Sequence, residues 1–144
     1  MADLESKFFG DLYNKPLPVI DPLTKPFWDN ARQNQLAVQS CNACGHLHIP
    51  PTPVCPSCLS KDLIWKHVSG RGTLLSWVVF HRAYWPGFDA DVPYQVCLVQ
   101  LEEGPIVVSN LVATTDRDVE VGKPVRVIFD RVTEQLTLPK FILA

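Results

Sequence analysis

Two short motifs, Cys41-Asn42-Ala43-Cys44 and Cys55-Pro56-Ser57-Cys58, decide how the middle of this chain folds. Each C-x2-C pair can curl so that two thiolates point at one ion, and ten residues separate the pairs. Four thiolates form the closed tetrahedral site that zinc prefers in structural positions, with no position left open for a substrate. The motifs therefore predict a structural zinc ion. Iron, as in rubredoxin, is the alternative metal, and buried or disulfide-paired cysteines are the alternative without a metal.

Short runs of apolar residues flank the two motifs and predict a small sheet around the metal. Leu36–Cys41, Leu47–Ile49 and Leu63–Val68 are the three expected strands. Such a short segment buries too little apolar surface to fold unaided, so metal binding would supply much of its folding free energy. Residues 36–69 are thus predicted to be a zinc ribbon.

The chain after Gly70 has the pattern of an all-β domain. Glu102-Glu103-Gly104-Pro105 is a turn signal between two expected strands, at the spacing of a hairpin. Cys97 falls in the middle of an expected strand, where we expect it to be a small buried hydrophobic residue. Five strands in about 70 residues match the size of an OB-type Greek-key barrel, so residues 70–144 are predicted to be an OB-fold. The expected strands are Thr73–His81, Tyr94–Leu101, Ile106–Val112, Val125–Phe129 and Val132–Leu138.

Residues 1–35 are predicted to form short helices and a proline-rich linker. A helix over residues 3–13 would carry an apolar stripe of Leu4, Phe8 and Leu12, docked on its own domain or on a partner. A second helix is expected from Thr24 as N-cap to about Asn34, with Pro26 in its first turn and Phe27, Trp28 and Ala31 facing inward. The complete prediction is a mainly β protein with N-terminal short helices, a four-cysteine zinc ribbon and a five-stranded OB-fold barrel.

Length, composition and absent motifs narrow the function. A chain of 144 residues with 47% hydrophobic residues can build a core but is too short for a TIM barrel of about 250 residues. It contains no apolar run long enough for a membrane helix, and its acidic N-terminus lacks a signal segment, so a cytoplasmic protein is expected. G-x-S-x-G, H-E-x-x-H and P-loop motifs are all missing. No catalytic residue is therefore predicted, and catalysis by this chain alone is not expected.

Charge and aromatic residues are unevenly distributed. Although the formal net charge is −2, the stretch between Ala31 and Phe88 holds five basic residues and a single acid, Asp62. This basic middle suits an anionic ligand such as a phosphate, or is simply a solvated strand edge. The loop from Arg82 to Pro93 is rich in aromatic residues, which either cover the core or meet a partner or ligand.

Several further short stretches, before and after the strands of the predicted barrel, occur in an order that matches a known family. The stretches are Ser69-Gly70-Arg71-Gly72-Thr73, Ser76-Trp77, Pro93-Tyr94, Leu101-Glu102-Glu103-Gly104, Val121-Gly122-Lys123-Pro124-Val125 and Pro139-Lys140-Phe141. From Pro26 to Phe141 the chain resembles the domain-of-unknown-function family thirty-five, a rubredoxin-like zinc ribbon followed by an OB-fold. The resemblance carries the ribbon ligands over to Cys41, Cys44, Cys55 and Cys58.

The resemblance also implies a function. Members of that family are typically non-catalytic companions of acyl-CoA enzymes such as thiolases, condensing enzymes, retro-aldolases and hydratases. The chain is accordingly expected to be an accessory subunit that binds acyl-CoA, or completes the CoA channel of a thiolase-like or aldolase-like partner, in a hetero-oligomer. From charge and position, the expected CoA contacts are Lys66, Arg71, His81, Arg82 and Trp85. The expected partner contacts are Phe8, Leu12, Tyr84, Trp85 and Phe88.

Two other functions compete with this expectation. OB-folds and zinc ribbons also bind single-stranded nucleic acid, but the net charge is −2 and the aromatic residues gather in one loop instead of forming a stacking platform across strands. No nucleic-acid or membrane partner is therefore expected. A rubredoxin-like electron carrier would require iron in the four-cysteine site.

Overall fold

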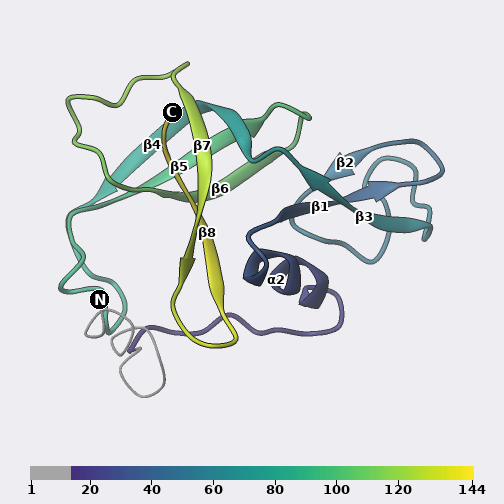
Figure 1. Ribbon diagram of the computed structural model, residues 1–144, viewed down its shortest axis with the longest axis horizontal. Helices are drawn as coiled ribbons and strands as arrows, with labels where there is room; N and C mark the ends of the chain where they lie inside the picture. The colour runs from purple at the N-terminus through teal and green to yellow at the C-terminus, as the bar shows by residue number, and fades with distance from the viewer. Residues whose placement is uncertain (1–13) are drawn as a thin grey trace.

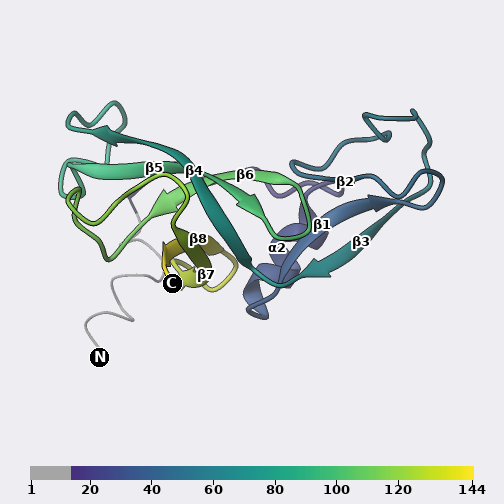
Figure 2. The ribbon, with the colours of Figure 1, turned by 90° about the horizontal axis from the view of Figure 1, so that it is seen from above.

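The computed structural model describes residues 14–144, which form two β modules lying side by side (Figures 1 and 2). One module is a three-stranded sheet with strand order β2-β1-β3, and the other is a closed barrel with strand order β4-β5-β6-β8-β7. The mainly β fold with a ribbon and a five-stranded barrel is thus confirmed. The elements are α2 (Lys25–Arg32), β1 (Leu36–Cys41), β2 (Leu47–His48), β3 (Leu63–Val68), β4 (Arg71–Phe80), β5 (Tyr94–Leu101), β6 (Ile106–Leu111), β7 (Pro124–Arg131) and β8 (Thr137–Leu143).

The predicted helix over residues 3–13, with its partner contacts Phe8 and Leu12, lies outside the described residues. Within residues 14–144, no helix is both long enough and apolar enough to cross a membrane.

The start of α2 is fixed by a reciprocal pair of hydrogen bonds. The backbone N–H of Thr24 donates to Oδ1 of Asp21 at 2.8 Å, and the backbone N–H of Asp21 donates to Oγ1 of Thr24 at 3.1 Å. Thr24 does occupy the N-cap position, but its hydroxyl does not cap the helix. The helix ends at Arg32, earlier than predicted, because Asn34 takes a left-handed conformation with φ 59°.

The ribbon and the barrel share one hydrophobic core. Leu36 and Val38 of β1 belong to the same buried cluster as Leu74 of β4 and Phe141 of β8. Phe27 of α2 packs against this cluster, and α2 contacts β1, β7 and β8. The helix therefore covers the seam between the two modules, as Figure 1 shows.

Only Ser69 and Gly70 separate β3 from β4 at this seam. Gly70 has φ 78°, and a Cβ there would overlap Cγ1 of Val127 on β7. The backbone carbonyl of Gly70 also accepts a hydrogen bond from the N–H of Val127 at 2.8 Å. The close approach of the two backbones thus requires glycine at the point where the ribbon enters the barrel.

The barrel differs from the sequence prediction in its last strand. A strand over Val132–Leu138 is wrong: β8 runs from Thr137 to Leu143, and residues 132–136 form the turn of the β7–β8 hairpin. The N–H of Val132 donates to the carbonyl of Leu136 at 3.0 Å. Val132 and Leu136 are buried although they lie in this turn, which explains why the segment has the apolar pattern of a strand.

Candidate functional site

The four ribbon cysteines converge on one point. The Sγ atoms of Cys41 and Cys58 lie 3.6 Å apart, as do those of Cys44 and Cys55, and all four sulfurs lie within 4.8 Å of one another. A tetrahedral zinc ion with Zn–S bonds of about 2.3 Å requires sulfurs separated by about 3.8 Å. The cluster therefore has the size of a closed four-thiolate zinc site.

The two cysteine pairs reach this geometry through the same backbone turn. The N–H of Gly45 donates to the carbonyl of Cys41 at 2.8 Å, and the N–H of Leu59 donates to the carbonyl of Cys55 at 2.9 Å. Both residues that follow the second cysteine are left-handed, with φ 78° for Gly45 and 63° for Leu59. The two knuckles are thus duplicates, one with glycine and the other with an exposed leucine at the strained position.

Backbone hydrogen bonds in the first knuckle also help the Cys41 thiol to ionise. Burial raises the pKa of the Cys41 thiol, but hydrogen bonds from the backbone N–H groups of Cys44 and Ala43 outweigh it and lower this pKa to about 7. Cys97 on β5 is the opposite case, because its burial in the barrel core raises its pKa to about 11. Cys97 is therefore a core residue and an inert thiol at neutral pH.

A buried polar network, which was not predicted from the sequence, supports the second knuckle. Oε1 of Gln39 lies 2.7 Å from Nε2 of His48 and accepts the backbone N–H of Thr52 at 2.8 Å. The Thr52 hydroxyl in turn donates to the carbonyl of Val54 at 2.6 Å. These contacts tie the loop that leads into Cys55 to strand β1. Burial lowers the pKa of His48, so its ring is neutral at pH 7 and serves this network.

The basic residues predicted to bind CoA do not form one site. Lys66 and Arg71 lie at the ribbon–barrel junction, whereas His81 and Arg82 follow the other end of β4. Ten residues of strand at about 3.3 Å each separate the two groups by roughly 30 Å. Arg71 is also engaged, since its Nε donates to the two carboxylate oxygens of Glu102 at 3.1 and 3.2 Å.

The loop between β4 and β5 exposes aromatic rings at its tip and buries others at its base. Tyr84 and Trp85 are 64% and 65% exposed. At the base, Phe80 stacks on Tyr94 with ring centroids 5.1 Å apart, and Phe88 packs on the same Tyr94 at 5.6 Å. Of the predicted contact residues, Phe88 is half-buried against the barrel, while Tyr84 and Trp85 are free to meet a ligand or partner.

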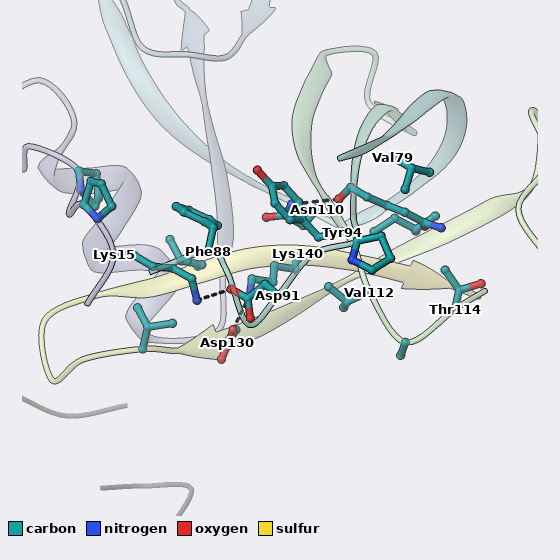
Figure 3. Close-up of a pocket in the computed structure, with 18 of the residues that line it drawn as sticks. Lys15, Val79, Phe88, Asp91, Tyr94, Asn110, Val112, Thr114, Asp130 and Lys140 are labelled. Carbon is teal, nitrogen blue, oxygen red and sulfur yellow. Dashed lines mark hydrogen bonds and ion pairs between the residues drawn. The ribbon is translucent and has the colours of Figure 1, made fainter. Parts of the chain in front are cut away.

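A cavity of about 1080 Å³, which the sequence did not predict, lies between this loop, the chain at residues 14–18 and the β7–β8 hairpin (Figure 3). Lys15 forms an ion pair with Asp91 at 2.6 Å and lies 5.4 Å from the centroid of the Phe88 ring. Across the cavity, Lys140 pairs with Asp130 at 2.6 Å. Residues 14–18 thus form one wall of the cavity, which we call the N-terminal strap.

The strap packs closely on the loop. A Cβ on Gly87 would lie 2.6 Å from the backbone oxygen of Asn14, and Pro16 shares a smaller hollow of about 220 Å³ with Trp85 and Phe88. Long-range contacts of this kind leave no periodic signal in a sequence, which is why the cavity could not be anticipated.

Comparison with known proteins agrees with this architecture. Residues 28–63 match the family model described as the ChsH2 rubredoxin-like zinc ribbon domain, and residues 65–130 match that of the ChsH2 C-terminal OB-fold domain. Over 127 residues, 88% of this chain, it is 37% identical to a probable enoyl-CoA hydratase alpha subunit of Thermomonospora curvata, of which it spans only 39%. Over 108 residues, 75% of this chain, it is 30% identical to a DUF35 domain-containing scaffold protein of Pyrococcus furiosus, of which it spans 79%.

Two solved structures share the fold. The structure titled "Ltp2-ChsH2(DUF35) aldolase" is 36% identical with a TM-score of 0.79, covering 88% of this chain and 98% of that one. A DUF35 protein of unknown function from Sulfolobus solfataricus is 13% identical with a TM-score of 0.61, over 99% of this chain and 96% of that one, and shows the fold alone. With its four-cysteine ribbon, its OB-type barrel and these matches along most of its length, the chain belongs to the DUF35 family.

Proposed function

We propose that this chain is a non-catalytic accessory subunit of an enzyme that acts on acyl-CoA. The observation that carries the proposal is the similarity of this chain to a chain of the Ltp2-ChsH2(DUF35) aldolase structure. The match covers 98% of that chain and 88% of this one. The name of the Thermomonospora curvata relative, a hydratase alpha subunit, points in the same direction. The partner would be a thiolase-fold enzyme of the thiolase, condensing or retro-aldolase type, or a hydratase, and the complex would act in the cytoplasm.

In this role the metal would be structural. Zinc bound by Cys41, Cys44, Cys55 and Cys58 would have all four positions filled by protein, so it would stabilise the ribbon and would not activate a substrate. The separation of the sulfurs and the closed donor set support zinc in this site. Iron in the same site is the outcome that metal analysis would have to exclude.

For the CoA thioester we favour the end of the barrel that carries the aromatic loop. His81, Arg82 and Trp85 lie there together, and Trp85 borders the hollow beside the strap. Arg71 is less suited to a phosphate because Glu102 already neutralises it, which leaves Lys66 as the more available cation at the junction. Arg82 stacks over the ring of Tyr84 at 5.5 Å, a position from which its guanidinium can still bind a phosphate.

The cavity itself suits the uncharged part of such a ligand. Among the described residues that line it, two lysines face three carboxylates: Lys15 and Lys140 against Asp91, Asp116 and Asp130. A phosphate would be repelled by this excess of negative charge, whereas an amide-bearing or apolar chain would be accommodated. The cations outside the cavity thus suit the phosphates of an acyl-CoA, and the cavity, which would repel a phosphate, suits its uncharged part.

The test is co-expression with a candidate thiolase-fold enzyme from the same genome. We expect a stable complex on size-exclusion chromatography and enzyme activity that depends on this chain. A chain that stays monomeric, beside an enzyme that is fully active without it, would refute the accessory role.

Ligand titration separates this function from nucleic-acid binding. At one fixed salt concentration the complex should bind CoA, and an oligo-dT strand should bind weakly. Arg82→Ala should lower CoA affinity severalfold, while Arg126→Ala, which removes an exposed charge from β7, should leave it unchanged. Tight, steeply salt-dependent DNA binding without any response to CoA would instead favour the single-stranded nucleic-acid module.

A further inference from the structure

The outer face of β4, β5 and β6 carries aliphatic side chains that the fold does not bury. Val78, Leu98, Ile106 and Val108 are 53%, 38%, 49% and 67% exposed. A single exposed aliphatic residue is ordinary on a protein surface, but several together usually mark an interaction site.

Strand register brings them into one patch. Val78 lies opposite Val96 across the β4–β5 pair, and Leu98 lies opposite Val108 across the β5–β6 pair. Ile106 is two residues before Val108 and so points to the same side of the sheet. Directly opposed side chains on one face have Cβ atoms about 5 Å apart. Val78, Val96, Leu98, Ile106 and Val108 thus form a continuous surface, which we call the aliphatic face.

The aliphatic face continues into the aromatic loop. Phe80 follows Val78 by two residues on the same side of β4, and it stacks on Tyr94 at 5.1 Å. Tyr84 meets the edge of Phe80 at 6.2 Å, and Trp85 is the next residue of the loop. Exposed apolar surface therefore extends from Ile106 on β6 to the tip of the β4–β5 loop.

The face carries no charge. Its neighbours on the outward side of the three strands are Thr73, Ser76, Gln100 and Asn110, which are polar but neutral, and the one charged outward position, Arg71 at the start of β4, is ion-paired with Glu102. In an OB-fold that binds nucleic acid, this side of the barrel supplies cations and stacking rings. An uncharged aliphatic surface offers nothing to a polyanion, and it complements only another uncharged apolar surface. Charged residues lie at its rim: Arg82 in the aromatic loop at one end, and Arg71 with Glu102 of the β5–β6 turn at the other.

We propose that the aliphatic face is the surface on which the partner enzyme subunit docks, through an uncharged apolar patch of its own. The inference rests on the proposed function, since it identifies where the accessory subunit meets its enzyme. An apolar centre with a charged rim is the usual anatomy of such an interface. The solved relative whose title pairs two proteins supports a different chain, in preference to a second copy of this one, as the occupant.

The experiment compares two substitutions of equally exposed valines. Val108 on the aliphatic face is 67% exposed and Val121, in the connection between β6 and β7, is 65% exposed. In the co-expressed complex, Val108→Glu should weaken association with the enzyme at least tenfold, whereas Val121→Glu should leave it unchanged. Ile106→Lys provides a second disruption of opposite charge. Zinc content and circular dichroism of each free variant should match those of the unsubstituted chain.

Each outcome separates this inference from the proposed function. If the unsubstituted chain forms no complex, the accessory role itself fails. If the complex forms and survives both Val108→Glu and Ile106→Lys, the enzyme docks elsewhere and only the aliphatic face is refuted. If the unsubstituted chain alone is a dimer and Val108→Glu makes it a monomer without affecting enzyme binding, the face joins two copies of this chain, which also overturns the inference.

Discussion

The glycine at the entry to the barrel gives the sharpest test of how the two modules are joined. Gly70→Ala is unfavourable for two reasons. The backbone at this position is left-handed, with φ 78°, and the new methyl group would overlap the side chain of Val127. Left-handed backbone costs a non-glycine residue about 1–2 kcal/mol, and an extra methyl group in a packed site costs about 1–3 kcal/mol. We therefore expect Gly70→Ala to lower the free energy of unfolding by about 2–5 kcal/mol.

The two contributions can be separated by a double-mutant cycle. Val127→Ala removes the methyl group that the new Cβ would strike, so in that background Gly70→Ala should cost only the backbone contribution of about 1–2 kcal/mol. Gly122→Ala is the matched control, because Gly122 has φ 91° and nothing within 4 Å of its Cβ position, and it should show that same cost alone. Urea unfolding at a fixed free zinc concentration, followed by circular dichroism, measures all four variants. Additive effects of Gly70→Ala and Val127→Ala would refute the steric account of this junction.

Three further predictions follow from the site. Cys44→Ser should abolish zinc binding, measured by atomic absorption, and unfold the ribbon while the barrel stays partly formed. Cys97→Ala is the control and should keep one zinc per chain. Because burial raises the pKa of Cys97 to about 11, its thiol should resist a disulfide reagent at pH 8 in the metal-loaded chain and react only after denaturation. Gly87→Ala should displace the strap, because its Cβ would lie 2.6 Å from the Asn14 oxygen, and so accelerate proteolysis around residue 15.

The cysteine spacing predicted the ribbon because metal ligation is a local property of two short motifs. Leu36–Cys41 and Leu63–Val68 were likewise predicted with the bounds that the structure shows, since each is an apolar run next to a knuckle. The barrel was predicted from the number and length of its strands. Its closure depends on β6 meeting β8 in parallel at Leu111 and Phe141, a pairing between segments far apart in the chain.

The last strand shows what a local pattern cannot resolve. Val132 and Leu136 are as apolar as strand residues, but they are buried at the end of a hairpin. Pro139, one residue past the predicted strand, lies in β8 opposite Phe129, and its carbonyl accepts the Ser109 hydroxyl at 2.7 Å. In this segment the buried apolar residues and the paired strand are therefore not the same residues. An apolar pattern in the sequence does not distinguish a buried turn from a strand.

The candidate ligand surfaces were the least predictable part. Composition placed Lys66, Arg71, His81 and Arg82 in one basic region, but the length of β4 separates them into two groups. The cavity and the aliphatic face arise from contacts across the barrel and across three strands, so neither leaves a motif in the sequence.

The shortness of the link between ribbon and barrel has a mechanical consequence. Two residues join β3 to β4, and Ser69 is fastened on the barrel side by Glu103, whose carboxylate accepts its backbone N–H at 2.9 Å. With a shared core beneath this link, the ribbon has no hinge about which to swing. The two modules are therefore coupled through their packing, because Leu36 and Val38 of the ribbon complete the cluster that holds Leu74 and Phe141 of the barrel. Unfolding the ribbon by removing zinc would then expose part of the barrel's own core, far from the metal.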